Sequence, residues 1–122
     1  MRTVDPICAT APPELAAHLP GIRVTLEEQR RFRLDQLGEL AEAAANAPPG
    51  ARSDAHDQVT EILRASAAKA LAEVEAALVR LRAGRYGICE RCASPIASLR
   101  LEILPMSRYC MRCQHCLDTV SA

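Results

Sequence analysis

Large aromatic side chains are nearly absent from this chain of 122 residues, which has no Trp, one Phe and two Tyr. Aromatic side chains normally dominate cores and interfaces, so a core built here from smaller residues is marginal on its own. A metal ion that staples the fold would supply the missing stability. The scarcity of aromatics also argues against a platform that stacks single-stranded nucleic acid, and the abundance of Ala favours helices over strands.

Net charge is lacking as well, because fifteen basic residues balance fifteen acidic ones. No global field therefore draws the chain to nucleic acid or to a membrane. No stretch approaches the ~20 apolar residues of a membrane span, and the N-terminal region has no unbroken apolar run typical of a signal peptide. We expect a cytoplasmic protein without a membrane partner, in which reduced thiols and paired CxxC motifs favour a metal over a disulfide.

Composition divides the chain into four segments. The N-terminal segment is Pro-rich and lacks a sustained period, with one short helical turn expected around Glu14–Leu19, and Cys8 within it is expected to be a free thiol without a structural role. The predicted segments are a flexible arm (1–21), a coiled-coil hairpin (22–83, with its tip at about 46–57), a zinc-finger module (84–116) and a short tail (117–122).

The first long helix is predicted from a cap and a stripe. Thr25 and Glu28 have the spacing of a capping box, which places the helix start at Thr25. Pro48 and Pro49 end the pattern, because proline removes amide donors and disfavours helix in the preceding residue. A 4-3-4-3-4 stripe lies between them and consists of Leu26, Arg30, Arg33, Leu37, Leu40 and Ala44.

A second long helix is predicted after the prolines. Ser53 is a good N-cap, Asp54 and Asp57 fall in the first turn, where the helix dipole favours carboxylates, and Gly84 provides the exit. Its seam repeats the 4-3-4-3-4 spacing and consists of Leu63, Ala67, Ala70, Val74, Ala77 and Leu81.

Two stripes joined by a short Pro/Gly turn predict a mainly α fold, an antiparallel coiled-coil hairpin of roughly 40 Å on a small four-cysteine zinc-finger base. A seam satisfied within one chain predicts a monomer. Leu71 and Leu78 lie beside the seam and are expected to be exposed, which leaves a dimer open.

Four cysteines form two CxxC pairs in the last third of the chain. Two residues between thiolates let one tight turn present both sulfurs to a tetrahedral ion, and a separation of about 15–20 residues lets a second turn complete the set. Four cysteines fill every coordination position, so we expect one structural Zn²⁺ and no catalytic metal. The predicted ligands are Cys89, Cys92, Cys110 and Cys113.

Other interpretations of this region stay open. The cysteines also fit a rubredoxin-like iron site or a dithiol redox pair, and His115 and Cys116 are alternative ligands. Tyr86 and Tyr109 stand next to the two CxxC motifs, where core packing competes with nucleobase stacking. An excess of arginine indicates either a solvated surface or a basic contact patch. The patch candidates are Arg85, Arg91, Arg100, Arg108 and Arg112.

The combined motifs resemble the DksA/TraR-type zinc-finger family. Residues 84–92 read G-R-Y-G-x-C-x-x-C, residues 96–105 read I-x-x-x-R-L-E-x-x-P, and residues 110–114 read C-x-x-C-Q. With the hairpin, the resemblance covers residues 25–116. It implies a bacterial transcription regulator that binds RNA polymerase directly through the secondary channel. The coiled-coil tip would lie near the active site, and no DNA sequence would be read.

The tip departs from the family pattern. In the best-known member the tip carries D-x-x-D-x-A. Counting back without gaps from Cys89 places these positions at Asn46, Pro49 and Ala51, so the alanine is present and both acids are absent. Asp54 and Asp57 restore the D-x-x-D spacing further on, either as displaced tip acids or as first-turn residues that complement the helix dipole. The candidates for polymerase contact are Asn46, Pro49, Ala51, Asp54 and Asp57.

The same count places three alarmone-contacting positions at Glu73, Leu104 and Gln114. None of these residues is basic, which argues against ppGpp sensing.

The chain shows no nucleophile–base pair, open metal site or phosphate-cradling glycine loop, so an enzyme with catalytic residues is not expected. The leading prediction is an RNA-polymerase-binding regulator. The alternatives are an Arg-rich zinc module that binds nucleic acid and a non-catalytic coiled-coil adaptor.

Overall fold

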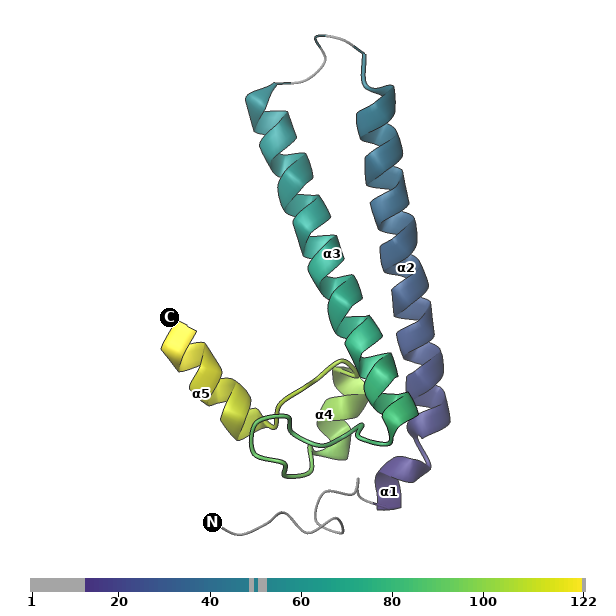
Figure 1. Cartoon of the computed structure of the whole chain (residues 1–122), viewed down its shortest axis with the longest axis vertical. Helices are drawn as coiled ribbons and strands as arrows, with labels where there is room; N and C mark the ends of the chain where they lie inside the picture. The colour runs from purple at the N-terminus through teal and green to yellow at the C-terminus, as the bar shows by residue number, and fades with distance from the viewer. Residues whose placement is uncertain (1–12, 49, 51–52, 122) are drawn as a thin grey trace.

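The computed structural model of the chain describes residues 13–48, 50 and 53–121. In Figure 1 two long helices form an antiparallel hairpin that stands on a small base, which confirms the expected mainly α fold. No strand occurs in these described ranges, and no helix within them has the length and apolarity that crossing a bilayer requires. The helices are α1 (Pro13–Ala16), α2 (Leu19–Asn46), α3 (Asp54–Ala83), α4 (Ser98–Ile103) and α5 (Met111–Ser121).

The ends of α3 agree with the sequence prediction. The Ser53 hydroxyl accepts a hydrogen bond from the His56 N–H (3.1 Å) and so satisfies one of the free first-turn amides. Gly84 follows the last turn with φ of 74°, and its N–H donates to the carbonyls of Arg80 and Leu81. Glycine adopts this left-handed conformation without the steric cost that a Cβ would add.

The start of α2 differs from the prediction. The helix begins at Leu19, and Pro20 occupies its first turn, where a missing N–H has no intrahelical acceptor to lose. Thr25 therefore lies inside the helix, and its Oγ1 donates to the Gly21 carbonyl (3.1 Å). The predicted capping box is wrong, because a threonine hydroxyl can bond to the carbonyl four residues earlier instead of capping.

The N-terminal region also differs from the flexible arm expected over residues 1–21. Leu15 in α1 is fully buried in the core of the base. His18 Nδ1 lies 3.2 Å from Glu102 Oε1, which links the start of α2 to α4. The short helical turn expected around Glu14–Leu19 overlaps α1, but this part of the chain packs on the base and is not a free arm. Residues 1–12, with Cys8, lie outside the described residues.

The seam between α2 and α3 is closed near the base and open toward the tip. Ala67, Val74 and Ala77 are buried on α3, whereas Leu63 is 46% exposed. Arg30 Nε donates to Glu75 Oε2 (3.1 Å) across the closed part. Figure 1 shows the two helices diverging toward the connecting loop, so the predicted seam is formed only over its inner half.

Leu78 lies in the core and not on the surface. Its side chain is 7% exposed, while Leu71 is half-buried. The expected exposure is therefore wrong for Leu78, which lies in one core cluster with Ile22 and Leu26 from the first turns of α2, and it holds only in part for Leu71.

One hydrophobic cluster joins the hairpin to the base. Its side chains come from α1, α2, α3, α4 and both CxxC segments, so the hairpin and the cysteines share a single core. The buried members are Leu15, Ile22, Leu26, Val74, Ala77, Leu78, Tyr86, Cys89, Ile96, Leu101 and Cys113.

The C-terminal segment is helical where a short tail over 117–122 was expected. α5 starts directly after Cys110 and runs to Ser121. Gln114 Nε2 donates to Asp118 Oδ1 (3.0 Å), four residues on, which supports the helix across the expected boundary.

Candidate metal centre

The first CxxC pair lies in a tight turn that follows α3. The Cys89 N–H donates to the Ser94 carbonyl (2.8 Å), and the Ala93 N–H donates back to the Cys89 carbonyl (2.9 Å). Ala93 has φ of 62° and is the one non-glycine with a positive φ among the residues described. A side chain in that region costs about 1–2 kcal/mol, so this turn must be held by interactions beyond its own backbone.

The second CxxC pair stands at the start of α5. Cys110 directly precedes the helix, and its carbonyl accepts a hydrogen bond from the Gln114 N–H (2.9 Å). Cys113 lies in the first turn. The unpaired amides and the dipole of a helix N-terminus favour negative charge, so both positions suit a thiolate.

The fold brings the four predicted ligands together. The Sγ atoms of Cys89, Cys92, Cys110 and Cys113 all lie within 4.8 Å of one another. The Cys92 and Cys110 sulfurs are 3.8 Å apart, and four sulfurs at ~2.3 Å from a tetrahedral ion are separated by about that distance. The arrangement is therefore suited to one zinc ion with no open coordination position.

The thiols of this cluster have opposed ionisation tendencies. Hydrogen bonds from Ser94 lower the pKa of Cys92 to about 6. Burial, together with hydrogen bonding to the three neighbouring cysteines, raises the pKa of Cys113 to about 12. Four adjacent thiols cannot all become thiolates without a compensating cation, and Zn²⁺ would supply that charge while displacing the protons.

The two alternative ligands are not part of this group. His115 and Cys116 are both exposed, and neither contributes an atom to the four-sulfur cluster.

Glu90, inside the first CxxC pair, connects the two cysteine segments and the hairpin. Its N–H donates to the Arg108 carbonyl (2.9 Å), and its Oε2 accepts a hydrogen bond from Arg108 Nε (3.0 Å). Its Oε1 lies 3.5 Å from Arg80 Nη1. One carboxylate therefore bridges the last turn of α3 and the segment that leads to Cys110.

Arg80 is a buried structural residue whose role the sequence analysis missed. It is 4% exposed, and its Nη2 donates to the carbonyls of Met106 (3.4 Å) and Ser107 (3.3 Å). Burial lowers the pKa of this guanidinium, although the Glu90 carboxylate opposes the shift. The available signal was its position three residues after Ala77, which places a charged side chain on the buried face of α3.

The two tyrosines pack as part of the local core. Tyr86 is buried, its hydroxyl donates to the Pro105 carbonyl (2.7 Å), and burial raises its pKa to about 12. Tyr109 is partly buried against the same cluster, with the Arg108 guanidinium 5.6 Å from its ring centroid. This arrangement favours the packing interpretation over nucleobase stacking.

The predicted basic patch is divided by these contacts. Arg108 is bound to Glu90, and Arg100 is half-buried with an Nε that has no hydrogen-bond partner. Arg85, Arg91 and Arg112 are exposed, and none of them has an ion pair within the described part of the chain.

The tip candidates are only partly described. Asn46 is the last residue of α2, and Asp54 and Asp57 are exposed in the first turn of α3. Pro49 and Ala51 lie outside the described residues.

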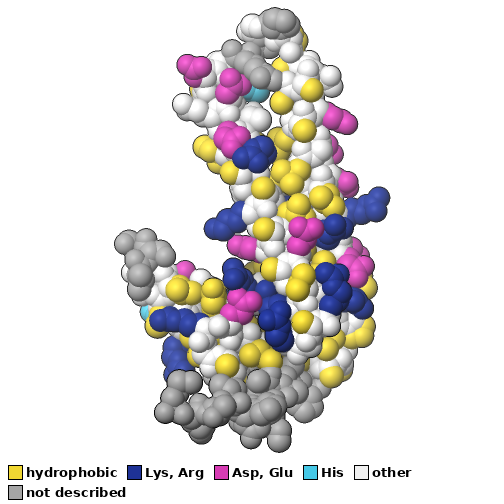
Figure 2. Space-filling model, viewed as in Figure 1, with side chains coloured by type: hydrophobic (Ala, Val, Ile, Leu, Met, Phe, Trp, Pro, Cys, Tyr) yellow, Lys and Arg dark blue, Asp and Glu magenta, His cyan; other side chains and the backbone are white. Residues whose placement is uncertain are grey.

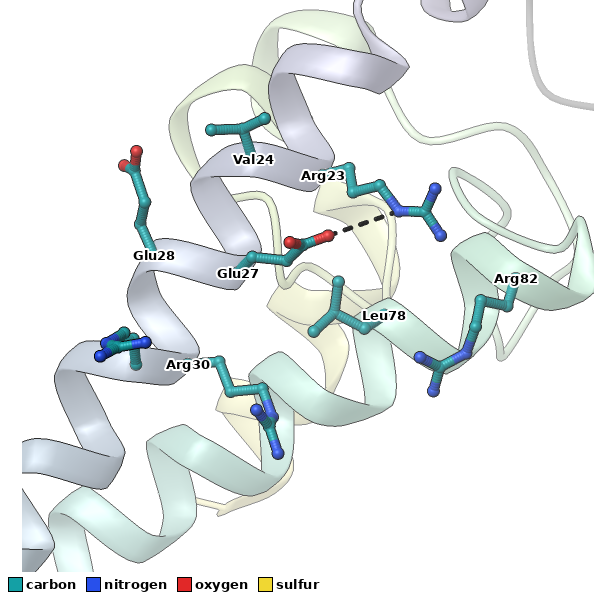
Figure 3. A pocket seen from close by; sticks show the side chains of 8 residues that line it. Arg23, Val24, Glu27, Glu28, Arg30, Leu78 and Arg82 are labelled. Atoms are coloured by element: carbon teal, nitrogen blue, oxygen red, sulfur yellow. Dashed lines mark ion pairs between the residues drawn. The ribbon is translucent and has the colours of Figure 1, made fainter.

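A second group of arginines, missed in the sequence, lines a groove of about 520 Å³ near the base of the hairpin. In Figure 3, Arg23 and Arg30 from α2 and Arg82 from α3 surround Leu78. Arg23 Nε lies 3.6 Å from Glu27 Oε1, the ion pair drawn there. No local signal reveals this groove, because its arginines meet only when the hairpin closes.

Comparison with known proteins identifies the cysteine segment. Residues 84–115 match the family model of the prokaryotic dksA/traR C4-type zinc finger, which confirms the resemblance and the zinc prediction. A stretch of 43 residues is 46% identical to an uncharacterized protein of Aquifex aeolicus (strain VF5), covering 35% of this chain. The aligned part spans 30% of that relative's length.

Proposed function

We propose that this chain, which carries a DksA/TraR-type zinc finger, regulates transcription by binding RNA polymerase directly. The family matched by residues 84–115 is one of transcription-related, non-catalytic regulators. The observation that carries the proposal is that the matched segment begins at Gly84, the residue that caps α3. Hairpin and zinc finger are therefore contiguous, as they are in the family that residues 25–116 resemble.

The dimensions of the hairpin support entry into a narrow channel. α2 has 28 residues and α3 has 30, which at ~1.5 Å per residue gives a rod about 42–45 Å long. In the proposed mode the rod passes through the secondary channel, its tip approaches the active site, and the zinc base rests on the rim. No contact with a particular DNA sequence is required.

A rod that acts at its tip needs a fixed direction at its base. Buried Arg80 binds α3 to Glu90 and to the carbonyls before Cys110, and the shared core includes two zinc ligands. The base can therefore aim the rod as one rigid unit when zinc is bound. Asp54 and Asp57, exposed at the start of α3, are the residues proposed to act near the active site.

Site-specific photocrosslinking to core RNA polymerase tests this mode. A photoreactive residue at exposed Ala55, beside the proposed tip acids, should crosslink to segments that border the active site. The same probe at exposed Arg91, in the zinc finger, should crosslink to the outer rim of the channel. Crosslinks from both positions to one outer surface, or none from Ala55 when Arg91 reacts, would contradict tip-first entry.

A paired substitution separates binding from action. Asp54→Ala/Asp57→Ala should abolish the effect on transcription even at chain concentrations that saturate core polymerase, with at most about a tenfold loss of affinity because Asp57 also lines a groove near the tip. Glu28→Ala removes an exposed carboxylate from the inner half of α2 and should change neither. An unchanged transcription effect in the double variant would show that these aspartates only complement the helix dipole.

Three exposed arginines keep nucleic-acid binding as a second candidate. Arg85, Arg91 and Arg112 have no ion pair in the described part of the chain and are free to contact phosphates. Binding of that kind falls steeply with salt, and each Arg→Gln change should reduce the salt slope by about 1. Saturable, salt-resistant binding to core polymerase without DNA would favour the first proposal. An adaptor for another protein would bind neither nucleic acid nor core polymerase.

A further inference from the structure

The outer half of the hairpin contains an open apolar groove, hereafter the tip groove. It has a volume of about 690 Å³, with Leu40 and Ala44 of α2 on one side and Val59 and Leu63 of α3 on the other. Val59 and Leu63 are 57% and 46% exposed. The apolar side chains of α2 and α3 that pack together near the base thus continue toward the tip, but there the two helices do not bury each other's side chains.

The groove has the spacing of a helix-binding surface. On α2, positions 40, 43 and 44 line it at i, i+3 and i+4, with Ala47 just beyond the helix end, and on α3 positions 59 and 63 line it at i and i+4. Rows with this spacing form one continuous apolar face on each helix. Two such faces that diverge can receive an amphipathic segment of a partner between them.

Charge is separated along the chain although its total is zero. Residues 34–66 contain six acidic residues and two arginines, a net charge of −4, so the rest of the chain carries +4. Figure 2 shows acidic side chains on both helices toward the tip, hydrophobic ones between them, and most basic ones nearer the base. Asp57 and Glu61 themselves line the tip groove, and the Arg64 guanidinium donates two hydrogen bonds to the Glu61 carboxylate, so Asp57 carries the less compensated charge.

We propose that the tip groove binds a basic amphipathic segment of a partner protein. Apolar side chains of that segment would enter between α2 and α3, and its Lys or Arg side chains would face Asp57 and Glu61 on the α3 side of the groove. An acidic segment is disfavoured by like-charge repulsion. The arginine groove near the base has the opposite polarity, so the two grooves together select one orientation of the hairpin on its partner. The identity of the partner rests on the proposed function, whereas the chemistry of the groove does not.

The test uses the full zinc-loaded chain and two helical peptides with one apolar pattern of leucines, one with lysine and one with glutamate at the polar positions. The lysine peptide should bind with an affinity at least about tenfold above that of the glutamate peptide. Leu63→Ser should lower the affinity for the lysine peptide by about tenfold. Val79→Ser is the matched control, since Val79 is also on α3 and also 46% exposed but does not line the groove.

A charge pair completes the test. Asp57→Asn/Glu61→Gln should weaken the binding of the lysine peptide, whereas Asp118→Asn, at an exposed position of α5 outside both grooves, should not. Equal binding of the two peptides, or equal effects of Leu63→Ser and Val79→Ser, would overturn the proposal. Helix content measured by circular dichroism checks folding, and Val59→Thr provides a milder second variant with the same expected direction.

Core polymerase separates this inference from the proposed function. A chain that binds the lysine peptide through the groove but does not bind polymerase contradicts the proposed function alone. A chain that binds polymerase equally well with and without Leu63→Ser, and shows no peptide preference, contradicts the groove alone.

Discussion

Arg80 Nη1, in the last turn of α3, lies 3.5 Å from Oε1 of Glu90. Glu90 stands between Cys89 and Cys92 in the sequence, which are the first two zinc ligands. The arginine is buried, and its other terminal nitrogen bonds to the carbonyls of Met106 and Ser107. The end of the rod and the metal-binding turn are therefore joined by a charged side chain inside the core. Loss of that side chain leaves these two carbonyls without this donor and leaves the Glu90 carboxylate paired with Arg108 alone.

Arg80→Ala should lower the free energy of unfolding of the zinc-loaded chain by about 2–4 kcal/mol. The cost arises because buried acceptors lose a charged donor and a cavity forms. Denaturant unfolding followed by circular dichroism measures it. Arg82→Ala, two residues on and exposed, should change the stability by less than about 0.5 kcal/mol. Equal effects of the two substitutions would contradict a structural role for Arg80.

The zinc ligands should be distinguishable from the neighbouring cysteine. Cys89→Ser should reduce zinc affinity by more than about a hundredfold, because a buried thiolate ligand is lost. Cys116→Ser should leave both the affinity and a stoichiometry of one zinc per chain unchanged. Titration against a chromophoric chelator measures both quantities. A similar loss in both variants would show that Cys116 serves as a ligand.

Two glycines should respond oppositely to alanine. A Cβ at Gly84 or at Gly38 would meet no atom within 4 Å, so only the backbone conformation differs. Gly84 has φ of 74°, and Gly84→Ala should destabilise the chain by about 1 kcal/mol. Gly38 lies inside α2, and Gly38→Ala should stabilise it by about 0.5–1 kcal/mol. Thermal unfolding of the two variants gives the signs, and matching signs would contradict the cap assignment.

Tyr86 should make the fold sensitive to alkali. Burial raises the pKa of Tyr86 from 10 to about 12. Its contribution to the free energy of unfolding is therefore complete below pH 10. Between pH 10 and about 12 the tyrosine ionises in the unfolded chain but not in the folded one, so this contribution is lost as the pH rises toward 12. Tyr86→Phe should be less stable than wild type at neutral pH, since the bond to the Pro105 carbonyl is lost, and the difference should shrink above pH 10. The Tyr109→Phe variant should still lose stability above pH 10, as the wild type does. A constant difference between Tyr86→Phe and wild type from pH 8 to about pH 11 would contradict this assignment.

The hairpin and the zinc ligands were predictable because their signals are local. Ser53 and Gly84 cap α3 through residues next to them in sequence, and each CxxC pair forms within one turn. The spacing of Val74 and Ala77 predicts a buried face without knowledge of what covers it.

The remaining features depend on which distant segments meet. Leu15 is buried because α1 folds against the base, and Leu78 because the first turns of α2 cover it. The Nη2 atom of Arg80 donates to carbonyls more than twenty residues away. The tip groove arises because the helices diverge beyond Ala67, although the spacing of Leu63 predicts a closed seam.

The central claim is direct binding to RNA polymerase through the secondary channel. Its most direct test is the binding of the labelled, zinc-loaded chain to core polymerase without DNA, with a known secondary-channel factor as competitor. The account predicts saturable binding at micromolar concentration or tighter, and complete displacement by the competitor. Absence of binding under conditions where the competitor binds, or binding that the competitor leaves unchanged, would contradict it.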